Sequence, residues 1–276
     1  MKNNNQKTQF YFHILTTLAI IPILLAACQS DEPVQIPTQE LPISIVEDAE
    51  EAMMELPVSS EPTISLNMGT LVEGMIEETV PAVLPNSERP YWEILPEHNV
   101  FTLEGYEISE HLLDAQIFIY PVAELGLYNA NAAQAAEDLE NLLDDQAVGE
   151  TLPFLPLFNA AQVMHAQVEF LDFQNGKGVR FLTQFDQAPI PINNYELIYT
   201  FQGLTNDGKY YIAAIFPVTH PDLPENNRVG IDQEFVPEQF AAEMAESVEK
   251  LDKLPMSSFS PDLNQLDTLI QSIEIK

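Results

Sequence analysis

Few side chains in this 276-residue sequence form a pattern that performs chemistry. The only thiol is Cys28, and the sequence contains neither a G-x-S-x-G nucleophile motif nor an H-E-x-x-H zinc motif. The histidines beyond Cys28 are too far apart in sequence to form a local metal site; they are His98, His111, His165 and His220. The sequence therefore predicts no catalytic residue and favours binding over catalysis. An alternative is a hydrolase whose site is assembled from residues distant in sequence.

One polar loop has the side chains of a cation site. Residues 220–234 carry Asp222, Glu225, Asp232 and Glu234, and carboxylate oxygens are the ligands that Ca²⁺ prefers. Their spacing does not match an EF-hand, and Arg228 lies among them. We therefore weigh a calcium site, and with it a cation-binding surface protein, against a solvated loop.

A group of tyrosines is the second candidate site. Tyr195, Tyr199, Tyr210 and Tyr211 lie on strand-like segments near a loop with two prolines at 186–194. Tyrosine offers an apolar ring and a polar hydroxyl, which suits a ligand groove. Ordinary packing within a sheet is the alternative, because aromatic residues are also common in strands.

The position of Cys28 is more informative than its chemistry alone. Lys2 and Lys7 precede an apolar stretch over residues 10–27, which is typical of a secretory signal and too short and interrupted for a comfortable membrane span. The stretch ends in Leu25-Ala26-Ala27-Cys28. This tetrapeptide resembles the lipobox of bacterial lipoproteins, in which an aliphatic residue and two small residues precede the cysteine.

The resemblance implies that Cys28 is the lipidated first residue of the mature protein. In that family the thiol receives a diacylglyceryl group, and acyl chains then hold the protein at the membrane by burying methylenes. Gln29 follows the cysteine where Asp would resemble an inner-membrane retention signal. We therefore expect the protein to face outside the cytoplasm, in the outer membrane if the cell has one.

Charged residues are unevenly distributed along the rest of the chain. Beyond residue 27 the sequence keeps 8 of its 10 bases and all 43 acids, a formal charge of −35, which argues against a nucleic-acid partner. From Asp31 to Glu88 there are 13 acids, seven prolines and no aromatic residue. Such a composition buries too little surface to fold. We expect a signal peptide at 1–27, the lipidated cysteine and a disordered acidic linker at 28–88, and one globular domain at 89–276.

The globular part has a mixed pattern of elements. Residues 112–122 read as a strand and 131–146 as a helix with an apolar stripe, and 151–159 form an apolar connection. Asn-Gly and Asp-Gly turns predict a four-strand meander. Prolines at a first helical position predict two late helices, that is, helices near the end of the sequence, and Ser260 is the predicted cap of the second. The predicted meander strands are 163–173, 179–185, 195–202 and 209–218, the predicted late helices are 237–251 and one starting at Pro261, and 272–275 is a closing strand.

These elements predict an α+β fold, an antiparallel sheet with helices packed on its faces. Their order is similar to that of the PsbP-like extrinsic proteins, a resemblance that rests on no diagnostic motif. It implies a role in helping to assemble or stabilise an envelope complex. We expect an envelope protein or a small ligand as the partner.

Overall fold

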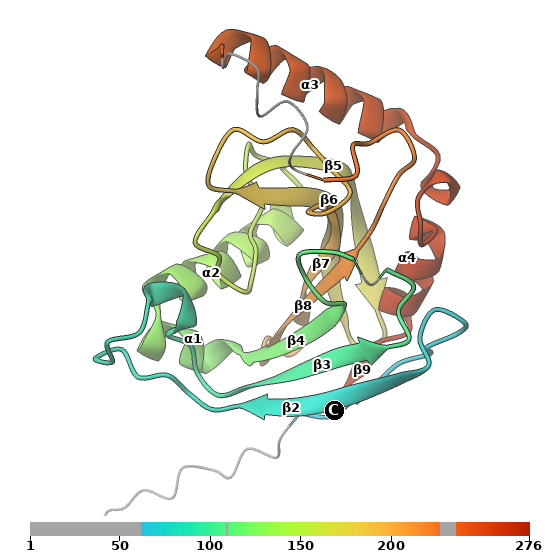
Figure 1. The fold of residues 1–276 in the computed structure, drawn as a ribbon. Helices are drawn as coiled ribbons and strands as arrows, with labels where there is room; N and C mark the ends of the chain where they lie inside the picture. The colour runs from blue at the N-terminus through green and yellow to red at the C-terminus, as the bar shows by residue number, and fades with distance from the viewer. Residues whose placement is uncertain (1–61, 109, 227–235) are drawn as a thin grey trace, which may run out of the picture. The chain divides into compact units, whose positions relative to one another are not determined.

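The computed structural model describes residues 62–108, 110–226 and 236–276. Contacts divide the chain between Val58 and Ser59, and every described residue belongs to the second unit. This unit contains a seven-stranded antiparallel sheet with helices on both faces (Figure 1). The α+β class predicted from the sequence is therefore confirmed.

The predicted meander forms one half of this sheet. β5, β6, β7 and β8 are neighbours in chain order, and Gly208 closes the β7–β8 turn with a φ of +68°, a conformation that favours glycine. The strands lie in the spatial order β2 (Gly74–Val80), β3 (His98–Glu104), β4 (Gln116–Pro121), β8 (Tyr210–Pro217), β7 (Ile198–Thr205), β6 (Gly176–Asp186) and β5 (Ala161–Phe173).

Helices α1 (Val122–Tyr128) and α2 (Ala130–Asp145) cover one face of the sheet (Figure 1). α2 confirms the predicted helix, and its apolar stripe is buried against β6 and β7. Asn129 caps it by accepting a hydrogen bond from the Asn131 N–H at 2.9 Å. On the other face lies α4 (Leu263–Gln271), while α3 (Pro237–Lys253) is mostly exposed and contacts β5 near its C-terminal end, where Leu251 is buried.

The cap of α4 differs from the expectation. Asp262, not Ser260, accepts the hydrogen bond from the first turn, through Asn264 N–H at 2.9 Å. The backbone of Ser260 instead pairs with Thr219 in a short antiparallel bridge. The helix therefore begins two residues later than proline and serine alone indicate. A 3-10 turn, η2 (Met256–Ser258), links α3 to this bridge.

The predicted boundary of the linker is wrong, because part of it is folded. β2 lies inside the 28–88 stretch and pairs along its length with β3, and β1 (Ile64–Ser65) pairs with β9 (Glu274–Ile275), which confirms the closing strand. β2 is an edge strand, and Glu77 and Glu78 on it are exposed. Backbone pairing holds such an edge strand with few buried apolar side chains, so the composition did not indicate it. Residues 28–61 lie outside the described part.

The strand predicted at 112–122 is shorter in the structure. β4 begins at Gln116, and Val122 already belongs to α1. Leu112 and Leu113 therefore lie in a connection rather than in the sheet. β3 and the 3-10 turn η1 (Tyr91–Glu93) that precedes it were not predicted from the sequence.

Candidate functional site

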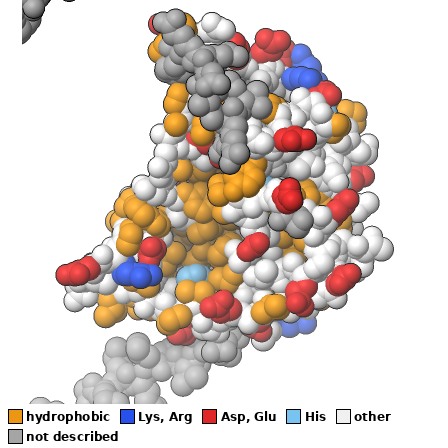
Figure 2. All heavy atoms as spheres, viewed as in Figure 1, with side chains coloured by type: hydrophobic (Ala, Val, Ile, Leu, Met, Phe, Trp, Pro, Cys, Tyr) orange, Lys and Arg blue, Asp and Glu red, His pale blue; other side chains and the backbone are white. Residues whose placement is uncertain are grey.

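A small apolar depression opens on the face of the sheet that carries α1 and α2. We call it the apolar hollow; its volume is about 110 Å³. Figure 2 shows hydrophobic side chains gathered in a depression on the face drawn. The hollow is lined by Leu112, Leu113, Phe158, Ala160, Phe185, Glu196 and Ile198. Leu112 leaves 53% of its surface exposed, so the rim is open to solvent.

One wall of the hollow is aromatic. The rings of Phe154, Phe158 and Phe185 contact one another, with centroids 4.5–5.3 Å apart. Two of these contacts are tilted and one is edge-to-face, arrangements that stabilise aromatic pairs beyond simple burial. The wall is therefore fixed before any partner arrives.

The aromatic wall stays on the sheet because a buried glutamine holds its backbone. Gln202 of β7 accepts a hydrogen bond from Leu155 N–H at 3.0 Å and donates to Leu155 O at 3.2 Å. Tyr211 donates its hydroxyl proton to the same Gln202 Oε1 at 2.7 Å. This bonding explains why a connection with two prolines packs like part of the core.

Glu196 is the only titratable residue among those that line the hollow. It is 8% exposed, and its Oε2 accepts a hydrogen bond from Asn193 Nδ2 at 2.6 Å. The Asn193 N–H donates to Gln184 Oε1 at 3.0 Å, and Gln184 Nε2 donates to Asp186 Oδ2 at 2.6 Å. The two carboxylates are thus linked through Asn193 and the Gln184 carboxamide behind the hollow.

The environment of Asp186 shifts its pKa. Burial raises its pKa above the ordinary value, and the negative charge of Glu196 raises the pKa further, while the hydrogen bond from Gln184 acts in the opposite direction. The strand next to the hollow therefore ends in an acid that resists ionisation.

His111 lies at the edge of the same region, one residue before Leu112. Its Nδ1 accepts from Leu113 N–H at 3.0 Å, and its Nε2 lies 3.0 Å from Leu197 O. This bonding fits the tautomer with the proton on Nε2. Burial lowers the pKa of His111 below 6.5, although nearby carbonyls and Glu196 oppose the shift. Both ring nitrogens are engaged by backbone, so the ring positions the segment that carries Leu112.

No family model, curated protein or solved structure matches this chain. What the hollow does must therefore be inferred from its residues. Its lining offers apolar contact and one carboxylate. This combination suits the docking of an apolar group better than acid–base or nucleophilic catalysis, which needs several groups within hydrogen-bond reach of a substrate.

The four predicted groove tyrosines do not come together. Tyr199 and Tyr211 are both fully buried, on opposite faces of the sheet, and Tyr210 lies at the other end of the strands from Tyr195. The predicted groove is wrong because the strand alternation places these rings in two different cores. Only Tyr195 lies beside the apolar hollow, where its carbonyl accepts from Leu112 N–H at 2.9 Å.

The predicted cation loop is only partly described. Asp222 forms an ion pair with Lys250 at 3.0 Å, and both side chains are more than half exposed. Glu225 is exposed, while Asp232 and Glu234 lie outside the described residues. Among the residues that the structure does describe, no group of three metal-ligating side chains is present.

The lipidation candidate Cys28 also lies outside the described part. Within residues 62–276, gaps excepted, none of the helices is both long and apolar enough to cross a bilayer.

A larger hollow of about 400 Å³ runs along α2, but its lining is mostly solvent-exposed. Its polar lining residues include Asn131, Gln134, Asp138, Asn141 and Asp145. These side chains form the solvated face of an amphipathic helix. We therefore prefer the smaller apolar hollow as the functional site.

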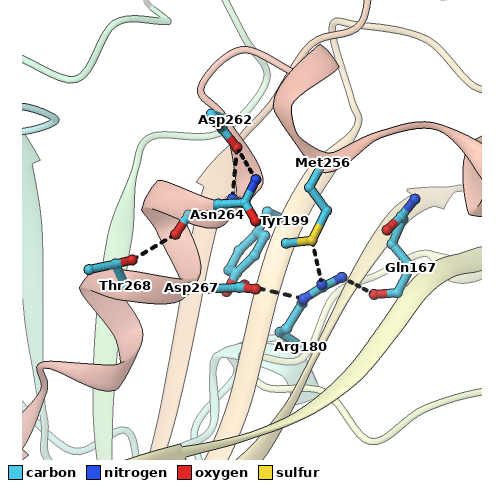
Figure 3. A network of polar contacts seen from close by, with 8 residues as sticks. All are labelled: Gln167, Arg180, Tyr199, Met256, Asp262, Asn264, Asp267 and Thr268. Carbon is cyan, nitrogen blue, oxygen red and sulfur yellow. Dashed lines mark hydrogen bonds and ion pairs between the residues drawn. The ribbon is translucent and has the colours of Figure 1, made fainter.

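A second polar network fixes α4 rather than forming a site (Figure 3). Arg180 of β6 is 3% exposed and lies 3.2 Å from Asp267 of α4, and the Tyr199 hydroxyl donates to Asp267 at 2.8 Å. The guanidinium also bonds to the Gln167 carbonyl and to the sulfur of Met256. These groups satisfy one another under the helix, so we assign the network to stability.

Proposed function

We propose that this protein is a lipid-anchored binding protein of the bacterial envelope, facing outside the cytoplasm. Its domain would contact an envelope protein through the apolar hollow and would not act as a catalyst. The observation that supports this best is a rigid, solvent-open hollow with six apolar or small residues and one acid in its lining. Such depressions anchor single side chains at the centre of protein interfaces.

The proposed location rests on the sequence around Cys28. The Leu25-Ala26-Ala27-Cys28 segment follows a basic start and an apolar run, in the order that resembles a lipoprotein signal. Two or more acyl chains on one sulfur and the new amino terminus would hold the chain stably at a membrane. With Gln29 next, the outer membrane is the expected site if the cell has one.

Size argues for a protein contact rather than a small-molecule site. The hollow holds about 110 Å³, whereas drug-sized ligands occupy pockets of roughly 300–1,000 Å³. A leucine- or phenylalanine-sized group fits a space of that order. The rest of the binding surface would then lie around the rim, as in interfaces with a central anchor and a polar surround.

In-cell photo-crosslinking tests the proposed function. A photoreactive amino acid replaces Leu112 at the rim of the hollow, or Leu127 on α1 as the control, which is 73% exposed. We expect discrete adducts from position 112 and none from 127. Equal patterns from both positions, or no adduct from 112, would contradict the assignment of the hollow.

Cys28→Ser tests the location separately. The variant should leave the membrane fraction, and the wild-type protein should carry the mass of acyl chains on its first residue. Wild-type protein without acyl mass, or a variant that stays in the membrane fraction, would overturn the proposed anchor.

A further inference from the structure

Resting on the proposed function, we propose that the partner presents a basic segment, with one apolar side chain that enters the apolar hollow and flanking Lys or Arg side chains that lie over its acidic rim. This inference names the chemistry of the occupant. It combines the shape of the hollow with the distribution of charge over the described domain.

The domain has no surplus base for an acidic partner. Every Lys and Arg that the structure describes already forms an ion pair with an acid of the same chain. The pairs are Arg89–Glu93, Lys177–Asp144, Arg180–Asp267, Lys209–Asp207, Lys250–Asp222, Lys253–Glu249 and Lys276–Glu274. An anionic partner would have to displace these pairs, whereas a cationic partner meets acids that outnumber the bases.

Acids are also concentrated beside the hollow itself. Glu196 lies in its wall, while Glu110 and Asp114 are exposed on the segment that carries Leu112. Figure 2 shows carboxylates scattered around the hydrophobic depression. A partner cation near the rim therefore gains favourable interaction from acids on more than one element.

The burial of Glu196 strengthens the preference for a cationic partner. Glu196 is 8% exposed and lines the hollow, so a docked apolar group would exclude much of the remaining water from it. Lower local polarity makes the attraction between a carboxylate and a nearby cation stronger. A partner that fills the hollow without supplying positive charge would leave Glu196 less well solvated than before.

Binding of two matched peptides tests the inference. The probes are hexapeptides with two lysines on each side of a Leu-Phe centre, or with glutamate in place of lysine, each carrying a neutral fluorophore. Fluorescence anisotropy is measured with the full chain in nonionic detergent. We expect the lysine peptide to bind, the glutamate peptide to bind at least about tenfold more weakly, and added salt to weaken the lysine peptide.

Two serine variants separate the hollow from general attraction to an acidic protein. Leu112→Ser should weaken binding of the lysine peptide by about tenfold, because it removes one apolar contact that binding would bury. Leu127→Ser should leave the affinity for this peptide unchanged. Both positions are more than half exposed, so both variants should fold, which circular dichroism checks. Glu196→Gln should weaken binding of the lysine peptide. Adding Leu112→Ser to this variant should weaken binding further, by the same factor as in the wild type.

The outcomes distinguish this inference from the proposed function. Equal binding of both peptides, binding of neither, or equal affinity of the wild type and Leu112→Ser for the lysine peptide would overturn the basic-partner inference. The proposed function would still be judged by crosslinking from position 112, because an apolar partner without basic residues would give adducts there and ignore the peptide charge.

Discussion

Arg180 of β6 lies 3.2 Å from Asp267 of α4; the Arg180 side chain is almost fully buried and that of Asp267 is mostly buried. The pair joins the centre of the meander to the last helix, and the Tyr199 hydroxyl bonds to the same carboxylate. Burial raises the pKa of Asp267 by more than the Arg180 charge lowers it. The ion pair is thus balanced against a large desolvation cost.

Breaking this pair should destabilise the domain strongly. Asp267→Ala leaves Arg180 buried without its charge partner, and we expect the free energy of unfolding to fall by about 3–5 kcal/mol. Tyr199→Phe should cost less, about 1 kcal/mol, because it removes one hydrogen bond. Urea denaturation measures the free energy of unfolding of both variants.

The matched control replaces both charges. Arg180→Met with Asp267→Leu should recover most of the loss, because no buried charge then remains unpaired. A double variant as unstable as the Asp267→Ala single variant would contradict the proposed cause.

The folded unit should require β2. A chain that begins at Pro62 keeps β1 and β2, and we expect it to unfold cooperatively at the same temperature as the full chain. A chain that begins at Arg89 loses both strands and exposes the backbone edge of β3. Unpaired edges promote aggregation, so this shorter chain should melt lower or aggregate. Thermal melting of the two chains decides, and identical melting would show that the linker does extend to residue 88.

Asp186→Asn should change the pH dependence of stability. The pKa of Asp186 is raised in the fold, so its contribution is most favourable below the unfolded pKa and is lost as pH rises through the folded pKa. Asparagine carries no such charge and still accepts the bond from Gln184. The stability of the variant relative to the wild type should therefore increase between about pH 4 and about pH 7. Urea denaturation at several pH values gives the difference in free energy of unfolding between the variant and the wild type. A difference that stays constant or decreases over this range would show that Asp186 is not desolvated.

His111 should titrate below its ordinary pKa of 6.5. Protonation would place a proton on Nδ1, which accepts a hydrogen bond from Leu113 N–H. The stability gained from the neutral ring is complete above the unfolded pKa and is lost as pH falls through the folded pKa. A proton NMR titration of the ring gives the value directly, and an apparent pKa above 6.5 would contradict the described bonding.

Local patterns were enough to predict much of this fold. The Asn-Gly and Asp-Gly turns gave the meander, and the apolar spacing at 131–146 gave α2, because both signals depend on near neighbours in sequence. β2 and β1 could not be found this way. They are held by backbone pairing with β3 and β9, which composition does not record.

The candidate site was harder to predict than the fold. Its lining residues come from four separate segments, and Leu112 and Leu113 read as the start of a strand. One feature of the sequence did point to the site. The connection at 151–159 is apolar, whereas surface loops are normally polar, which indicates that it packs against the rest of the domain. Conversely, Tyr199 and Tyr211 looked like ligand contacts because one sequence does not reveal how deeply each face of a strand is covered.

The central claim is that the apolar hollow is covered by a partner in the cell. Asn159→Cys places a thiol between the lining residues Phe158 and Ala160, and Leu127→Cys places one on α1; Cys28 is the only native cysteine, and the wild type gives its background. Maleimide labelling rates are compared between intact cells and the purified protein. We predict that Cys at 159 is protected in cells and reacts freely once purified, while Cys at 127 reacts equally in both. Equal reactivity at 159 in cells and after purification would contradict the account.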